Sequence, residues 1–217
     1  MAILTWDDTG KRLFETGVDR GVLFVMGTSS YNSGVAWNGL TSVTESPSGA
    51  EANDQYADNI KYLSLMSAEN FGGTIEAFTY PDEFGACDGI ISPSVGLNLG
   101  QQGRKQFGLA YRTKVGNDVS GQDFGYKIHL VYGCLATPSE KQYSTINDSP
   151  EAMTLSWEFT STGVVTGSYK PVASLTVDST VATPAKLKAL EDKLYGTASL
   201  ESTLPLPAEV ITMMAGA

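Results

Sequence analysis

The sequence has one histidine, two cysteines and no long apolar run. His129 alone supplies no His-rich metal site, and a Ser-His-Asp triad would depend on this one imidazole inside a predicted strand. Cys87 and Cys134 show no metal-ligand spacing, and the N-terminal residues lack the apolar core of a signal peptide, so we expect a reducing, cytosolic site of synthesis. No window approaches the ~18 apolar residues of a membrane helix. We predict no enzyme activity, no catalytic, cofactor or metal-binding residues and no membrane span.

Basic residues are scarce as well. The chain has 14 Lys and Arg against 24 Asp and Glu, a net charge of −10, which argues against sequence-specific DNA or RNA binding. Residues 1–100 hold 13 acids and 4 bases, whereas residues 101–217 hold 11 acids and 10 bases. This asymmetry is typical of an anionic surface or cavity, although a plain soluble acidic surface explains it equally well.

Short motifs that resemble ligand sites have simpler interpretations. The Gly100–Gly108 stretch has glycines and a basic pair, but no Lys-Ser or Lys-Thr follows, so it is better read as a turn before a strand. Asp118 and Asp123 lack the alternating oxygen ligands of a calcium loop. Aromatic residues that alternate with apolar ones indicate core rather than a sugar-stacking platform; they are Tyr111, Tyr126, Tyr132, Trp157 and Phe159.

Alternating and short apolar segments predict an all-β fold, a β-sandwich or partial barrel, as one domain over residues 1–217. Strands are predicted at Gly21–Met26, Val35–Gly39, Ser42–Glu45, Ile60–Leu65, Thr74–Tyr80, Phe107–Lys114, Gly125–Leu135, Met153–Thr160 and Ala173–Asp178. The turn-rich segment between Phe107–Lys114 and Gly125–Leu135 predicts that these two strands form a hairpin.

One flanking helix is predicted over residues 183–196. Thr183 can cap its N-terminus, Pro184 suits the first helical position and Gly196 fits the stop. The apolar stripe of this helix consists of Leu187, Leu190 and Leu194.

Four segments remain as arms and long connections. Residues 1–20 are expected to form an N-terminal arm, residues 46–59 and 80–100 long loops, and residues 197–217 a C-terminal tail with an apolar end. Long loops in a compact domain are usually functional or disordered. The first loop is acidic with no base, and no ligand set or nucleophile occurs in it.

Several segments, in consistent order over most of the chain, resemble the major tail protein, or tail-tube subunit, of long-tailed phages and prophages of Gram-positive bacteria with non-contractile tails. They are WDDTGKRLFETGVDRGVLF (Trp6–Phe24), GVAWNGLTSVTESPSGAE (Gly34–Glu51), YADNIKYLSLMSAENFGGTIEAFTYPDEF (Tyr56–Phe84), GQQGRKQFGLAYRTKVGND (Gly100–Asp118), GYKIHLVYGCLATPSEKQYSTINDSPEAMTLSWEFTST (Gly125–Thr162) and PAKLKALEDKLYG (Pro184–Gly196).

The resemblance implies a β-sandwich virion protein that assembles into hexameric rings, which stack into a tail tube through which DNA is ejected. Implied partners are further copies of the chain, a tape-measure protein, tail terminator and tail-tip or baseplate proteins, and genome DNA passing non-specifically through the lumen. The implied location is the virion tail, after synthesis in the host bacterial cytoplasm. Loops and arms of this family bridge successive rings, a role that fits the long connections here.

We therefore hypothesise that the two loops are assembly joints and that part of the acidic excess faces the lumen, where carboxylates repel phosphate. The residues expected in the first joint are Glu45, Pro47, Glu51, Asp54, Tyr56 and Asp58. Those expected in the second are Asp82, Glu83 and Asp88. The alternatives are a carbohydrate- or receptor-binding β-sandwich module and a tail-tip or terminator ring of the same fold.

Overall fold

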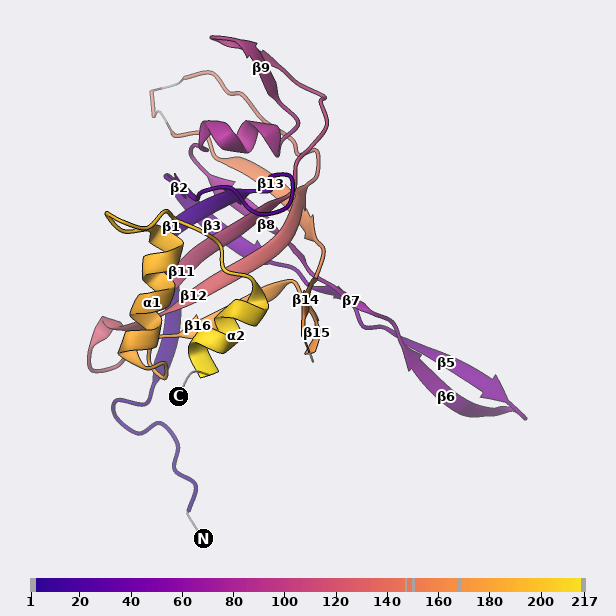
Figure 1. The fold of residues 1–217 in the computed structure, drawn as a ribbon. Coiled ribbons are helices and arrows are strands. Elements are labelled where there is room, and N and C mark those ends of the chain that lie inside the picture. The colour runs from indigo at the N-terminus through magenta and orange to yellow at the C-terminus, as the bar shows by residue number, and fades with distance from the viewer. Residues whose placement is uncertain (1–2, 147, 150, 168, 216–217) are drawn as a thin grey trace.

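The computed structural model describes residues 3–146, 148–149, 151–167 and 169–215, so residues 1–2 of the expected arm and 216–217 of the expected tail lie outside the described residues. Within this part of the chain, eight strands form one antiparallel sheet in the order β2-β1-β11-β12-β13-β8-β3, with β16 also paired to β12 (Figure 1). They are β1 (Leu13–Val25), β2 (Val35–Trp37), β3 (Leu40–Glu45), β8 (Gly72–Ala77), β11 (Phe107–Asn117), β12 (Gly121–Ala136), β13 (Leu155–Ser161) and β16 (Ser174–Asp178).

The sheet curls into a partial barrel, because β1 near one end of the strand order contacts β3 at the other end. The concave face is filled by an aromatic core. The Phe84 ring lies 4.7 Å from Trp37, 5.4 Å from Phe107 and 5.2 Å from Trp157, measured between ring centroids. Phe84 comes from a short 3-10 helix, η1 (Asp82–Ala86), which places that ring in the barrel interior. The all-β prediction is confirmed.

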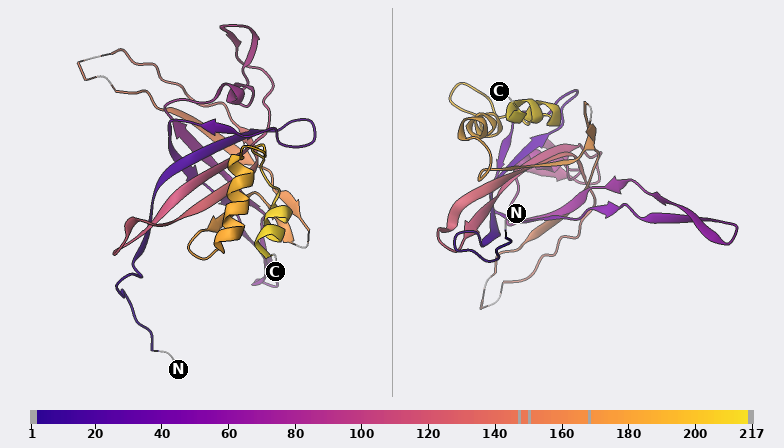
Figure 2. Two further views of the ribbon diagram at one scale, coloured as in Figure 1. Left: turned by 60° about the vertical axis from the view of Figure 1, so that its left-hand side comes forward. Right: turned by 90° about the horizontal axis from the view of Figure 1, so that it is seen from below.

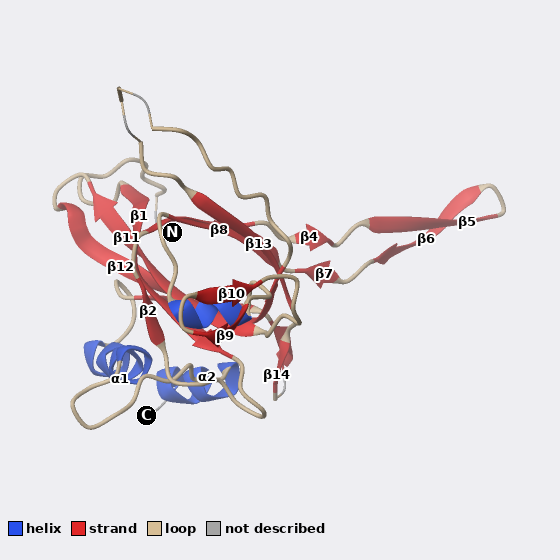
Figure 3. Cartoon of the chain, turned by 90° about the horizontal axis from the view of Figure 1, so that it is seen from above, coloured by secondary structure: helices blue, strands red, loops and turns tan. Residues whose placement is uncertain are grey.

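The convex face of the sheet carries a second core, covered by helices α1 (Pro184–Tyr195) and α2 (Pro207–Ala215). Leu187, Leu190 and Leu194 of α1 are buried against Ile128 and Leu130 of β12 and their neighbours, which confirms the predicted helix and its stripe. Thr183 occupies the N-cap position, although its side chain makes no capping hydrogen bond. Figure 3 shows α1 and α2 side by side on one side of the sheet.

The β11–β12 hairpin forms as predicted, with Tyr111 opposite His129. Tyr111, Tyr132, Trp157 and Phe159 are buried, so the prediction that these aromatic residues belong to the core is confirmed. Tyr126 is half-buried at the edge of the convex core.

One predicted boundary is wrong. The irregular arm ends at Arg12 rather than at residue 20, because residues 13–20 already pair with β11 through a ladder that two register shifts interrupt. The apolar end of the expected tail is helical, since Pro207 starts α2 and Val210 packs into the convex core. Neither helix among the described residues is long and apolar enough to cross a membrane.

Two smaller hairpins lie outside the main sheet. The expected loop 80–100 contains η1 and the hairpin β9 (Ile91–Ser94) and β10 (Leu97–Leu99). The hairpin β14 (Val164–Thr166) and β15 (Tyr169–Val172) lies beside the helical side of the sheet. Figure 2 shows that the N-terminal arm and the β9–β10 hairpin leave the body at different ends.

Candidate assembly surface

The most prominent feature of the molecule is a long two-stranded projection between β3 and β8 (Figure 1). It comprises β4 (Ser48–Gly49) paired with β7 (Glu69–Asn70) at its base and β5 (Ala52–Ala57) paired with β6 (Ile60–Met66) toward its tip. The prediction of an irregular loop over 46–59 is therefore wrong. Asp58 and Asn59 have φ values of 52° and 64°, the backbone of a two-residue type I′ turn, and this turn reverses the chain.

The projection packs little against the rest of its own subunit. Every residue of β6 is exposed, and in β5 only Asp54 is partly covered. Large apolar or aromatic side chains are exposed along it: Tyr56, Ile60, Tyr62, Leu63, Leu65 and Met66. An isolated two-stranded hairpin is at best marginally stable in water, and a run of exposed apolar side chains marks an interaction site. The projection has the properties of a surface that another molecule covers.

The register gives the projection two unlike faces. Asn53 lies opposite Leu65, and Gln55 opposite Leu63, so these four side chains share one face, which Ala57 and Ile60 extend toward the tip. We call it the uncharged face, and its residues are Asn53, Gln55, Ala57, Ile60, Leu63 and Leu65.

The opposite face carries an ion pair. The Asp54 carboxylate lies 2.7 Å from Lys61 Nζ and accepts a 2.6 Å hydrogen bond from Ser64 Oγ. The Lys61 ammonium, more than the Ser64 hydroxyl, holds the pKa of Asp54 below its ordinary value. The charged groups of this face are paired within the hairpin, although Tyr56 and Met66 beside them are exposed. The uncharged face has exposed apolar area and no charged group.

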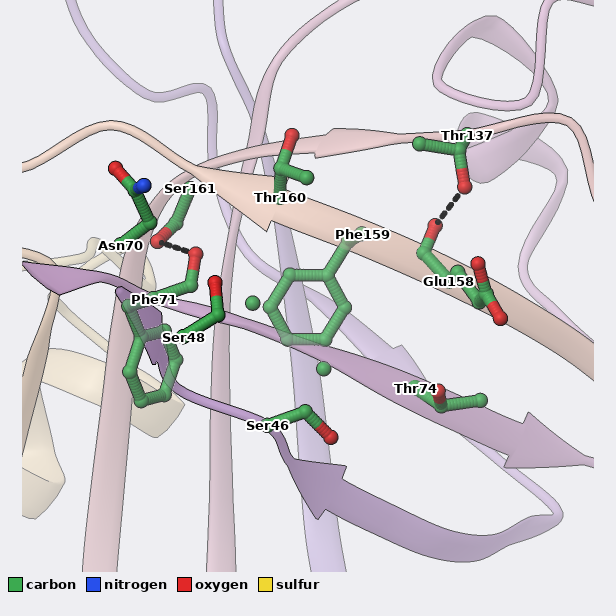
Figure 4. Close-up of a pocket in the computed structure, with 12 residues that line it drawn as sticks. Ser46, Ser48, Asn70, Phe71, Thr74, Thr137, Glu158, Phe159, Thr160 and Ser161 are labelled. Atoms are coloured by element: carbon green, nitrogen blue, oxygen red, sulfur yellow. Dashed lines mark hydrogen bonds between the residues drawn. The ribbon is translucent and has the colours of Figure 1, made fainter. Parts of the chain in front are cut away.

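A polar groove of about 580 Å³ lies where the projection joins the body (Figure 4). Its walls come from the residues just after β3 and β12, the base of the projection, β8 and β13. Ser161 Oγ donates a 2.7 Å hydrogen bond to the carbonyl of Phe71, which fixes one wall. The labelled polar side chains around the groove are Ser46, Ser48, Asn70, Thr74, Thr137, Glu158, Thr160 and Ser161. The hydroxyl and amide groups among them can hydrogen-bond a polar partner as donors and acceptors, and the Glu158 carboxylate can accept further hydrogen bonds.

Glu45, the last residue of β3, is held by its side chain at the point where the chain leaves the body for the projection. Its Oε1 accepts a 2.5 Å hydrogen bond from the Tyr111 hydroxyl and lies 3.7 Å from His129 Nδ1. The Tyr111 and His129 rings stack at 4.7 Å with an interplanar angle of 3°. Burial is the main cause that lowers the pKa of His129. The single histidine thus belongs to a structural cluster at the mouth of the barrel.

The remaining residues expected in the first joint lie along the projection. Pro47 is exposed between β3 and β4, and the exposed Glu51 follows β4, with its backbone N–H donating to Ser67 Oγ at 3.0 Å. Tyr56 is 70% exposed on β5, and Asp58 is exposed in the turn. All of the expected residues from Pro47 to Asp58 therefore belong to one projecting element.

The three residues expected in the second joint lie in different environments. Asp82 and Glu83 are exposed on η1. Asp88 is buried, with its carboxylate 3.3 Å from Arg104 Nη1 and 2.6 Å from Lys141 Nζ. Asp88 therefore holds three segments of one subunit together, and the exposed apolar residues of the β9–β10 hairpin, Ile91, Val95, Leu97 and Leu99, are what this region presents to solvent.

Within the described residues, no three His, Cys, Asp or Glu side chains gather as a possible metal site. Cys87 and Cys134 are free thiols in the concave core, and burial raises the pKa of Cys87 to about 12. Sequence reasoning missed the hairpin form of the projection and its uncharged face. The Asp58-Asn59 pair, flanked by Ala57 and Ile60, was the available signal for the turn.

Two solved structures to which the chain is similar share a loose likeness of fold. No family model matches the chain. No curated protein matches it either. Among solved structures, a chain of an extracellular contractile injection system, the PVC sheath–tube complex in its extended state, is 12% identical at a TM-score of 0.33, over 73% of this chain and 88% of that one. A chain of the anti-feeding prophage (AFP) baseplate is 8% identical at a TM-score of 0.34, over 80% of this chain and 97% of that one. Likenesses this loose do not decide what the chain does.

Proposed function

We propose that this protein is a structural subunit that polymerises with copies of itself into a phage-type tail tube. The supporting observation is the projection formed by β4, β5, β6 and β7. Its β5–β6 hairpin is exposed on both faces and carries apolar side chains away from the body. A folded subunit gains little from such an element by itself, since folding orders the hairpin without burying its apolar area. Docking on another copy would bury that area.

In this proposal six subunits form a ring, the rings stack, and the projection bridges neighbouring subunits. The resemblance in sequence to tail-tube subunits favours rings over an irregular polymer. The partners are the tape-measure, terminator and tail-tip or baseplate proteins, and the assembled protein is located in the virion tail. A carbohydrate-binding module receives less support, because four of the five aromatic residues that could have formed a stacking platform are buried.

The acidic excess has a physical role in a tube. Genome DNA that passes through a narrow bore slides freely if carboxylates line the bore, since a basic wall would hold phosphates through counterion release. Part of the acid excess in residues 1–100 faces the lumen in this proposal. Reconstruction of the assembled tube tests the assignment, and a neutral or basic bore would overturn it.

Removal of the projection tests the function directly. Ser46 N–H donates to the Gly72 carbonyl at 2.8 Å, so β3 and β8 remain close when the projection is cut away. We would replace Ser48–Asn70 with Asn-Gly and compare this variant with the full chain by negative-stain microscopy and sedimentation. The full chain should form rings or tubes, and the variant should remain a folded small species. A full chain that stays monomeric at high concentration in all buffers, or a variant that forms normal tubes, would refute the proposal.

A further inference from the structure

We infer that the N-terminal arm of one copy docks in an apolar pocket between β1, β2 and α1 of a second copy, with Trp6 filling the pocket and Asp7 pairing with Arg20. This contact rests on the proposed function only in that both require copies of the chain to associate. It is a different surface from the projection.

The arm presents an apolar segment with one unpaired carboxylate. Ile3, Leu4 and Trp6 are 91%, 74% and 77% exposed. Asp8 is paired with Lys11 at 2.9 Å, whereas the Asp7 carboxylate has no hydrogen-bond or ion-pair partner among the described residues. An exposed tryptophan next to a free carboxylate is a suitable anchor for a pocket that offers apolar walls and a cation.

A pocket of this kind lies on the body of the same molecule. Its volume is about 320 Å³, and its walls include Val22, Ala36, Leu194 and Tyr195. Pockets that hold small ligands span roughly 300–1,000 Å³, so this one is large enough for an indole side chain. Arg20 is the charged residue of the lining.

Arg20 is placed by an irregularity of β1. Its φ of 50° lies in the left-handed region, within the register shift between Asp19 and Val22. Bulges of this kind redirect a side chain, at a cost in backbone strain. The guanidinium lies 5.5 Å from the centroid of the Tyr195 ring, and no carboxylate within the described residues forms an ion pair with it. A tryptophan entering the pocket meets both an aromatic wall and a cation.

The arm cannot reach the pocket of its own subunit. Gly10 is fixed at the far end of β1, where its N–H donates to Asp118 Oδ1 at 2.9 Å and its carbonyl accepts from Asn117 Nδ2 at 3.2 Å. Trp6 is four residues before Gly10, so its Cα lies at most ~14 Å from that of Gly10. Val22, in the pocket lining, pairs with Ala110 and Leu13 pairs with Asn117, so the two ends of this span lie seven residues of β11 apart, or about 23 Å at the rise of a strand. Figure 1 shows the arm running away from the body.

The occupant is therefore a second copy. Arm and pocket are different surfaces, so each copy can donate one arm and accept another, a head-to-tail contact that continues into a ring or a polymer. Asp7 and Arg20 give the contact its charge complementarity.

Disulfide trapping tests the inference. A chain carrying both Thr5→Cys and Ala36→Cys should form a ladder of covalent oligomers under mild oxidation, whereas either single variant stops at dimers. The native thiols do not compete, because Cys87 and Cys134 are fully buried. The matched control combines Thr5→Cys with Val165→Cys, an exposed position on β14. A ladder no longer than that of the control would overturn the inference.

Charge reversal and fluorescence provide readouts specific to the proposed partners. In the double-cysteine chain, Asp7→Arg and Arg20→Glu should each lower the yield of covalent oligomers at least about fivefold. Combining the two substitutions should restore the yield. Lys170→Glu on β15 should leave the yield unchanged. Trp37 and Trp157 are already buried, so a blue shift of tryptophan emission on assembly should come from Trp6 and vanish in Trp6→Phe. Failure of the double reversal to restore the ladder, or a shift that survives in Trp6→Phe, would contradict the assignment.

The outcomes also separate this inference from the proposed function. Tubes that form without a ladder would leave the tube assignment standing and exclude the arm contact. A ladder in a protein that forms no tubes or rings would support the arm contact and exclude the tube assignment.

Discussion

The Tyr111 hydroxyl donates a 2.5 Å hydrogen bond to Glu45 Oε1, across 66 residues of sequence. The bond ties the centre of β11 to the end of β3, at the point where the chain leaves the barrel for the projection. The end of β3 is therefore held by a polar contact as well as by its pairing with β8.

Tyr111→Phe should lower the free energy of unfolding by about 1–2 kcal/mol, the range for a hydrogen bond to a charged acceptor that keeps some contact with water. Glu45 is 39% exposed at its side chain, so its carboxylate can still be hydrated in the variant. Urea denaturation measures the change, and Tyr143→Phe, at a 77% exposed position, is the control. A double-mutant cycle with Glu45→Gln should show a coupling energy; strict additivity would mean that the bond contributes nothing.

Stability should fall as the pH decreases through about 6.5, the ordinary histidine pKa. Burial lowers the pKa of His129 in the folded protein, with Glu45 and Glu15 acting against this shift and Lys127 adding to it. In this pH range the unfolded chain binds more protons than the folded one, so protons favour unfolding. Urea midpoints between about pH 7 and 5 measure the slope, and His129→Gln should flatten it, since no other histidine is present. An unchanged slope in His129→Gln would assign the pH dependence to carboxylates.

The sheet and α1 could be predicted because their apolar residues follow a regular strand or helix period toward the two cores. Phe107–Lys114 and Gly125–Leu135 alternate cleanly, and α1 has leucines at helical spacing, so burial and sequence period agree. The predicted strand Gly21–Met26 is shorter than β1, because the register shifts at Thr16/Val18 and Asp19/Val22 break the alternation of apolar residues. Local bulges remove the signal that identifies a strand.

The projection could not be predicted as a hairpin from apolar alternation. β5 reads ANDQYA, and neither of its faces is buried within the subunit, so no core imposes a pattern on it. The second joint shows a different limit. Asp88 lies in an acidic segment without bases, so the sequence predicts an exposed carboxylate in a loop. Its ion-pair partners, Arg104 and Lys141, are 16 and 53 residues away in the sequence, and only folding brings them close.

Asp88→Asn should destabilise the subunit by about 2–3 kcal/mol, below the 3–5 kcal/mol for a fully buried pair because both bases keep some solvent contact. Arg104 and Lys141 side chains are 23% and 24% exposed, so each would lose its carboxylate while still partly desolvated. Thermal unfolding measures the loss. Asp82→Asn, on the exposed side of η1, is the control and should change stability by less than about 0.5 kcal/mol. Equal effects of the two substitutions would show that the Asp88 cluster has no special role.

The final prediction concerns which face of the projection docks. Leu65 and Met66 are neighbours in β6 with similar exposure, 57% and 65%, but they point to opposite faces, Leu65 to the uncharged face and Met66 to the face of Asp54 and Lys61. A glutamate at either position should leave the monomer equally stable, because neither side chain is buried in it. Leu65→Glu should raise the concentration needed for assembly at least about tenfold, since fully burying a leucine is worth about 1.5–3 kcal/mol and the new carboxylate would be desolvated.

Met66→Glu should assemble close to the full-chain concentration. Sedimentation over a concentration series measures both variants, and circular dichroism confirms that both are folded. The reverse order, with Met66→Glu blocking assembly and Leu65→Glu permitting it, would place the docking surface on the charged face. The comparison is decisive because these adjacent strand residues point in opposite directions while their exposure and their distance from the body are similar.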